Sequence, residues 1–124
     1  MVELITRRLY VSRLNDLSQS ASAKLINIRE KVSSSPENVF FRFSYAQQLS
    51  TEDRLEEAVK QLNICLNSKS DWMMAVFLKS KLELRLGRNS DAIDSLKKTI
   101  ELARIQQHED PLSEATEMLN SLTG

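Results

Sequence analysis

The chain has 124 residues, enough for one domain that buries roughly two-thirds of the surface exposed by its unfolded form. Its two glycines and two prolines are too few for the turns of an all-β fold, so the composition favours helices. Lys and Arg number 17, as do Asp and Glu, and this balance argues against nucleic acid or a membrane as a partner. No apolar run is long enough to span a bilayer or to form the core of a secretory leader, so we predict a soluble, cytoplasmic protein.

Residues 1–34 are predicted to form an N-terminal helical extension. Leu14, Ala21 and Ile28 recur every seven residues, which places them on one apolar stripe of a helix. Serines dilute this stripe. We therefore expect the helix to pack on the rest of the chain over its later half and to be frayed or disordered before about residue 11.

Residues 35–124 are predicted to form one domain of five further helices. Ser35 as a cap and Pro36 in the first turn are expected to start the first of them. Gly87 tolerates the positive φ of a helix end, and Asp110 with Pro111 is expected to start a last, capping helix. The apolar spacing and these boundaries predict helices over about 36–50, 55–67, 72–86, 90–105 and 111–122.

The pattern of residues 54–66 returns thirty-four residues later, over 88–100. The offset pairs Ala58 with Ala92, and upstream it pairs Phe43 with Phe77. Matching small, aromatic and acidic residues at one fixed offset indicates an internal structural repeat, so we assign repeat 1 to residues 36–69 and repeat 2 to 70–105.

Helix pairs at this period resemble the tetratricopeptide repeat family over about residues 36–105. The resemblance rests on small residues within the first helices and on alanines and large apolar residues in the second helices: Ala46, Ser80, Ala58, Ala92, Leu62 and Leu96. The chain departs from the family pattern at Arg42 and Val76, where an aromatic is frequent, and at Lys79 and Glu83, where apolar residues are preferred. The resemblance implies an all-α, right-handed stack of two degenerate hairpins between an N-terminal helix and a C-terminal capping helix.

The residue inventory does not support catalysis. His108 is the only histidine and Cys65 the only cysteine, and neither forms a metal-ligand spacing or a nucleophile with a base. Two glycines cannot form a phosphate-binding loop. We therefore predict that the protein is not an enzyme and binds no metal or cofactor.

In tetratricopeptide arrays the first helix of each pair lines a concave groove, and the resemblance implies that this groove binds a partner here. The expected partner-binding residues are Phe40, Phe43, Gln47, Met74, Phe77, Lys81, Leu84 and Arg85. They form an apolar floor with basic side chains at one side, which suits an apolar or amphipathic segment carrying acidic residues. The predicted function is non-catalytic protein–protein binding.

Three alternatives remain open at this point. The N-terminal helix could fold across the groove and use Phe43 and Phe77 as plain core. It could instead form a homodimer through its apolar edge. Contact with a membrane or nucleic acid through Arg7, Arg8 and Arg13 is the third and ranks last.

Overall fold

The computed structural model describes residues 21–124. Six α-helices, and no strands, make up the regular secondary structure of this part of the chain, as the all-α prediction requires. They are α2 (Ala23–Ser34), α3 (Val39–Thr51), α4 (Leu55–Ser68), α5 (Met73–Arg85), α6 (Asn89–Ile105) and α7 (Glu109–Thr123). The predicted start of the N-terminal extension, including its fraying before residue 11, lies outside the described residues.

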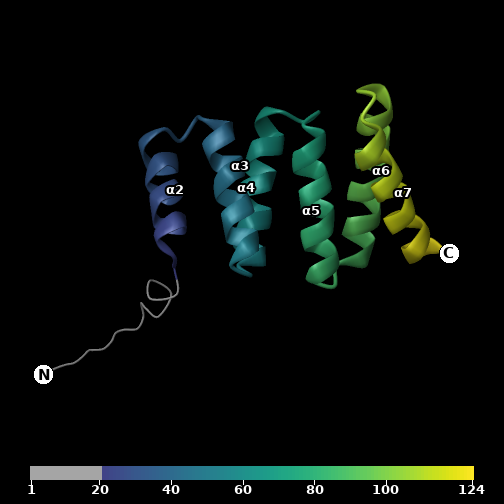
Figure 1. Ribbon diagram of the computed structural model, residues 1–124, viewed down its shortest axis with the longest axis horizontal. Helices are drawn as coiled ribbons and strands as arrows, with labels where there is room; N and C mark the ends of the chain where they lie inside the picture. The colour runs from purple at the N-terminus through teal and green to yellow at the C-terminus, as the bar shows by residue number, and fades with distance from the viewer. Residues whose placement is uncertain (1–20) are drawn as a thin grey trace, which may run out of the picture.

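The helices stand side by side in chain order, each antiparallel to the one before, from α2 at one end to α7 at the other (Figure 1). Helices α3 and α4 form the first hairpin, and α5 and α6 form the second. Both helices of the second hairpin begin thirty-four residues after their counterparts, at Met73 against Val39 and at Asn89 against Leu55. The repeat seen in the sequence is therefore a repeat of backbone structure, while the handedness of the stack stays a prediction.

Helix α2 packs on α3 through one apolar side, where Leu25 and Val32 are buried. Its first turn is capped by Ser22, whose hydroxyl accepts a hydrogen bond from the amide of Leu25. The carboxylate of Glu52, just beyond α3, in turn accepts hydrogen bonds from the amide and the hydroxyl of Ser22. The start of α2 is thus attached to the end of α3.

Helix α3 starts three residues later than predicted, at Val39, and Asn38 rather than Ser35 is its cap. The side-chain oxygen of Asn38 accepts hydrogen bonds from the amides of Phe40 and Phe41, at 3.0 and 3.1 Å. The Asn38 amide donates to the Ser35 carbonyl, which closes a turn containing Pro36. Proline suits the second position of such a turn as well as a first helical turn, and this ambiguity explains the error.

Three of the helices are followed by a residue with positive φ. These residues are Asp53 after α3, Gly87 after α5 and Gln107 after α6, with φ of 62°, 77° and 61°. After each, the next amide donates to a carbonyl five residues back, which stops the helix and turns the chain. The last of these turns starts α7 at Glu109, so the predicted start at Asp110 and Pro111 is two residues late.

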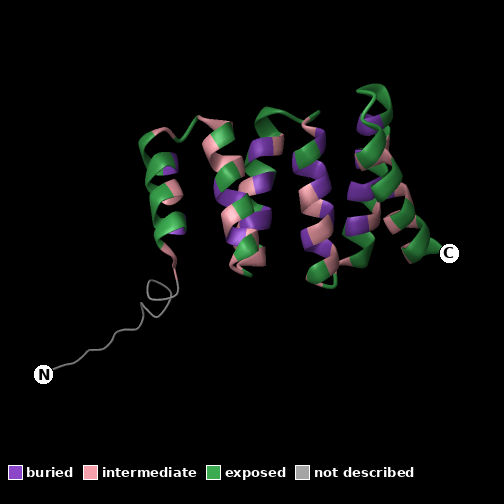
Figure 2. Cartoon of the chain, viewed as in Figure 1, coloured by how far each residue is buried: buried purple, intermediate pink, exposed green. Residues whose placement is uncertain are grey.

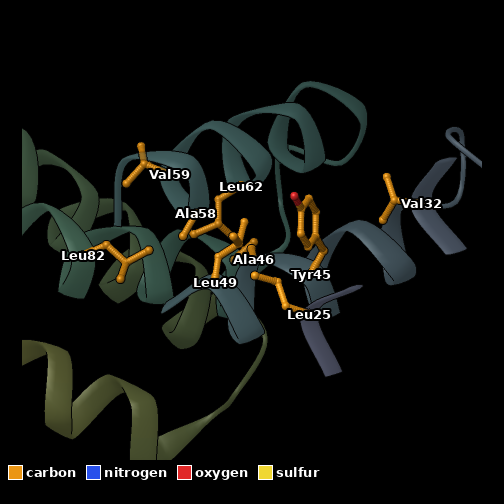
Figure 3. Close-up of a cluster of buried hydrophobic side chains, with 10 residues drawn as sticks. Leu25, Val32, Tyr45, Ala46, Leu49, Ala58, Val59, Leu62 and Leu82 are labelled. Atoms are coloured by element: carbon orange, nitrogen blue, oxygen red, sulfur yellow. The ribbon is translucent and has the colours of Figure 1, made fainter. Parts of the chain in front are cut away.

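The main core lies where the helices cross most closely (Figure 3). Ala46 of α3 and Ala58 of α4 are fully buried there, together with Leu49 and Leu62. Ala92 of α6 is equally buried in the second hairpin. Larger side chains at these positions would force the helices apart, which is the physical reason for the alanines that mark the repeat.

The two polar departures from the family pattern are accommodated as a pair inside the second hairpin. Glu83 is almost completely buried, and its carboxylate accepts a hydrogen bond of 2.7 Å from the hydroxyl of Ser95 on α6. The ammonium group of Lys79, one turn earlier, lies 4.0 Å from the same carboxylate. The buried charge is therefore compensated, and these residues serve the contact between α5 and α6.

Candidate partner-binding site

Helix α3 presents three of the expected partner-binding residues, and all three are open to solvent to some degree. Phe40 is 65% exposed, Phe43 is half-buried and Gln47 is exposed. The spacing of Phe40 and Gln47, seven residues, puts them on one side of the helix. We call the side of the stack formed by α3, α5 and α7 the first-helix face.

Trp72, the residue before α5, contacts α3 on this face. The centroid of its ring lies 4.8 Å from the centroid of the Phe43 ring and 5.4 Å from that of the Phe40 ring. The Phe40 pair has an edge-to-face arrangement. Such pairs are stabilising beyond the area they bury, so the exposed Phe40 ring is held in place by its neighbour. These three rings form the aromatic patch. Trp72 was not among the partner-binding residues expected from the sequence.

A cavity of about 400 Å³ adjoins the aromatic patch at the start of α5. Its apolar wall is made by Trp72, Met73 and Met74, and Met74 is 47% exposed. Gln106 and His108 also line it, and the Gln106 amide group donates a hydrogen bond of 3.0 Å to the carbonyl of Asp71. Met74, predicted from the sequence, is therefore brought close to the patch through Trp72.

Phe77 does not belong to this open surface. It is only 2% exposed and forms a core cluster with Leu96 of α6 and Ala115 of α7. Met118, also on α7, packs against the same cluster. The expectation that Phe77 faces a partner is corrected here, because α7 covers it.

The two basic residues expected to meet a partner are each paired within the chain. The ammonium group of Lys81 lies 3.1 Å from the carboxylate of Glu114 on α7 and 4.2 Å from the centre of the Phe77 ring. The guanidinium of Arg85 pairs with Asp53, in the turn between α3 and α4. Leu84 lies between them along α5 and is half-buried.

Helix α7 adds acidic side chains to the first-helix face that sequence reasoning did not place there. The contact of Glu114 with Lys81 shows which side of α7 borders α5. Asp110 and Glu117, four residues before and three after, lie on that side too and are exposed. We call Asp110, Glu114 and Glu117 the acidic row. Its helical spacing was readable in the sequence, but not the side of the molecule that it faces.

Figure 2 shows how burial varies along the stack: α5 is largely buried or half-buried, whereas exposed residues run along α2 and α7. The first-helix face is thus apolar at α3, mixed at α5 and acidic at α7. The cavity beside Trp72 is local to the start of α5, and the predicted concave groove stays a prediction.

Within residues 21–124, no group of three or more His, Cys, Asp or Glu side chains is placed to hold a metal ion. Cys65 is fully buried, and burial raises the pKa of its thiol, which makes it unreactive. None of the helices α2 to α7 is long and apolar enough to cross a membrane.

Solved structures provide close matches to this architecture. The solution structure of a tetratricopeptide repeat domain protein from Salinibacter ruber is 29% identical, covers 73% of this chain and 91% of its own, and has a TM-score of 0.65. PcrH, solved with the chaperone-binding region of PopD, is 16% identical with a TM-score of 0.75, covering 80% of this chain and 75% of its own. A protein from Bordetella parapertussis is 15% identical with a TM-score of 0.72, covering 82% and 89%.

Comparison with models of protein families finds no match, and comparison with curated proteins finds no similar sequence. The structural matches and the thirty-four-residue offset between the two hairpins agree with each other. At 29% identity the Salinibacter ruber domain also resembles the chain in sequence. Two helical hairpins, flanked by α2 and α7, thus give this chain the fold of the tetratricopeptide repeat.

Proposed function

We propose that the protein is a non-catalytic binding module that holds an apolar segment of a partner protein on its first-helix face. The aromatic patch would contact the partner's apolar side chains, and the cavity beside Trp72 would accept one of them. The observation that carries the proposal is the exposure of Phe40, 65%, although its ring is fixed against Trp72. A large apolar side chain that is both exposed and held rigid loses little entropy on binding.

The charges of the face support a basic rather than an acidic partner. Lys81 and Arg85 are already paired with Glu114 and Asp53, so they offer no free positive charge. Asp110 and Glu117 add negative charge beside them. A partner segment with apolar residues followed by Lys or Arg is complementary to this order, which replaces the acidic partner expected from the sequence.

The architecture of a known neighbour is compatible with this function. PcrH, which shares the fold, was solved in complex with the chaperone-binding region of PopD. At 16% identity this match extends to the fold alone, so it supports a binding role in general and names no partner. The binding residues proposed for this chain rest on its own contacts.

Co-purification from a lysate of the source cells, followed by mass spectrometry, tests the proposal. We expect Phe40→Ala and Lys81→Glu to change the set of captured proteins, the first by removing apolar contact and the second by altering charge. Ile64→Ala on α4 is the matched control, since Ile64 is 44% exposed and lies on a second helix of a pair. Retention of every wild-type partner by the Phe40 variant would count against the proposal.

Homodimerisation through the N-terminal helix has less support from the described part of that helix. Leu25 and Val32, which carry its apolar stripe, are buried against α3. Lys24, Asn27 and Lys31 are exposed, and Ile26, at 42%, is the one large apolar side chain of α2 that is exposed. Sedimentation of the full chain over a range of concentrations distinguishes the two proposals, because only self-association changes the mass.

A further inference from the structure

The first-helix face leaves two features without a partner inside residues 21–124. One is the aromatic patch with the adjoining cavity, and the other is the unpaired part of the acidic row, Asp110 and Glu117. An occupant that satisfies both must be apolar where it meets α3 and positively charged where it meets α7.

The chain itself contains a segment of this chemistry. Residues 1–14 carry Tyr10 together with six aliphatic side chains, namely Val2, Leu4, Ile5, Leu9, Val11 and Leu14. The same fourteen residues contain Arg7, Arg8 and Arg13 against a single acidic residue, Glu3. This segment is basic in a chain whose formal charge is zero, so its charge is complementary to the acidic row.

The distance between the segment and the face is short enough for contact within one chain. Ser22 is attached to Glu52 at the end of α3, whereas Phe40 lies at the start of the same helix. Twelve residues of helix separate that end from Phe40, which is about 18 Å. Residues 15–21, fully extended, span roughly 23 Å, so residues 1–14 can reach the patch without strain on the Ser22 contact.

We infer that residues 1–14 occupy the first-helix face of their own chain, with aliphatic side chains on the aromatic patch and arginines beside the acidic row. The inference rests on the proposed function in one respect, namely that this face is a binding surface. A partner then has to displace the segment, and its apparent affinity is reduced by the fraction of chains in which the face is free. The segment acts as a built-in competitor that sets a threshold for partner binding.

Trp72 provides a direct readout, because it is the only tryptophan and belongs to the patch. Acrylamide quenching of its fluorescence is measured on the full chain and on a variant with Arg7→Glu, Arg8→Glu and Arg13→Glu. Loss of the ion pairs with Asp110 and Glu117 should weaken docking by roughly 2- to 30-fold and make Trp72 more accessible to the quencher. High salt should do the same to the wild type.

The matched control changes the same number of charges away from the face. Lys24, Lys60 and Lys97 are exposed on α2, α4 and α6, and their replacement by Glu should leave Trp72 quenching as in the wild type. Circular dichroism of both variants checks that the helices are intact. Equal quenching in the wild type and the arginine variant at low salt would overturn the inference.

A second arm uses a labelled peptide with the sequence of residues 1–14. We expect it to bind the arginine variant, whose face is free, more tightly than the wild type, and to lose binding when Phe40→Ala is added. Equal binding to wild type and arginine variant overturns docking within one chain, as does a Trp72 change that depends on protein concentration, which would indicate a second copy. Neither outcome affects the partner capture by Phe40 that tests the proposed function.

Discussion

The two hairpins repeat the same backbone, but side chains at equivalent positions differ in burial. Phe43 of α3 is half-buried beside Trp72, and Phe77 of α5, thirty-four residues later, is only 2% exposed. The difference comes from the next first helix along the stack. Small Ala115 lets α7 pack over Phe77, whereas Trp72 lies beside Phe43 at the start of α5. A repeat position is therefore surface or core according to its neighbour, and not according to its own residue type.

The largest effect we expect is the unfolding of the second hairpin. Ala92→Arg places a charged side chain where the alanine of α6 is fully buried, and the loss of unfolding free energy should exceed about 4 kcal/mol. Thermal unfolding followed by circular dichroism should show loss of the cooperative transition or a strongly lowered midpoint. Asp91→Arg, next in sequence and exposed, is the control, and an unchanged melt of the Ala92 variant would show that the repeat register is wrong.

Replacing Phe43 and Phe77 tests their difference in burial directly. Phe77→Ala should lower the free energy of unfolding by about 3–5 kcal/mol, because it leaves a cavity under α7. Phe43→Ala should cost about 1–2 kcal/mol, since its ring is only partly removed from water. Urea unfolding of both variants gives the two values, and equal losses would contradict the difference in burial.

The turns that end the helices offer a smaller and cleaner test. Gly87→Ala should destabilise the protein by about 1–2 kcal/mol through its positive φ alone, because nothing lies within 4 Å of an added Cβ. Gln107→Gly, at the equivalent conformation after α6, should instead stabilise by about 0.5–1 kcal/mol. Urea midpoints that move in the same direction for both variants would show that φ is not the controlling factor.

The smallest effect concerns the attachment of α2 to the first hairpin. Hydrogen bonds from Ser22, and then from Gln48, hold the pKa of Glu52 below its usual value of 4.5. The stabilisation is therefore fully present above about pH 4.5 and is lost as the pH falls through the lower pKa of the folded state. Amide exchange in α2 should accelerate on acidification in the wild type and be less sensitive to pH in Glu52→Gln. Identical pH profiles would exclude Glu52 as the titrating group.

Local features of the fold were predictable, because they depend on residues close in sequence. Ala58 and Ala92, with apolar residues one turn later, set the register of both hairpins, and Gly87 marked a helix end correctly. The start of α3 was not predictable, since Ser35 and Asn38 are both acceptable caps and only the closed turn selects Asn38.

The candidate site was predicted less well, because its composition depends on contacts between distant residues. Phe40 and Met74 were expected on the surface and lie there. The burial of Phe77 and the pairing of Lys81 with Glu114 both depend on how α7 packs on α5, which no local pattern specifies. Sequence periodicity identified the helices that form the face, and tertiary packing decided which of their residues remain available.

The helix pairs in closest contact in this stack are consecutive in the chain, so each helix depends mainly on its immediate neighbours for stability. Such an array behaves as a one-dimensional system, so an end helix can unfold while the interior persists. Helix α2 contacts α3 less extensively than α7 contacts α6 and is therefore the weaker end, whereas α5 is enclosed by neighbours on both sides. Hydrogen exchange should therefore proceed inward from the ends, and departure of α2 alone would uncover Tyr45 and Leu49 while leaving the aromatic patch in place.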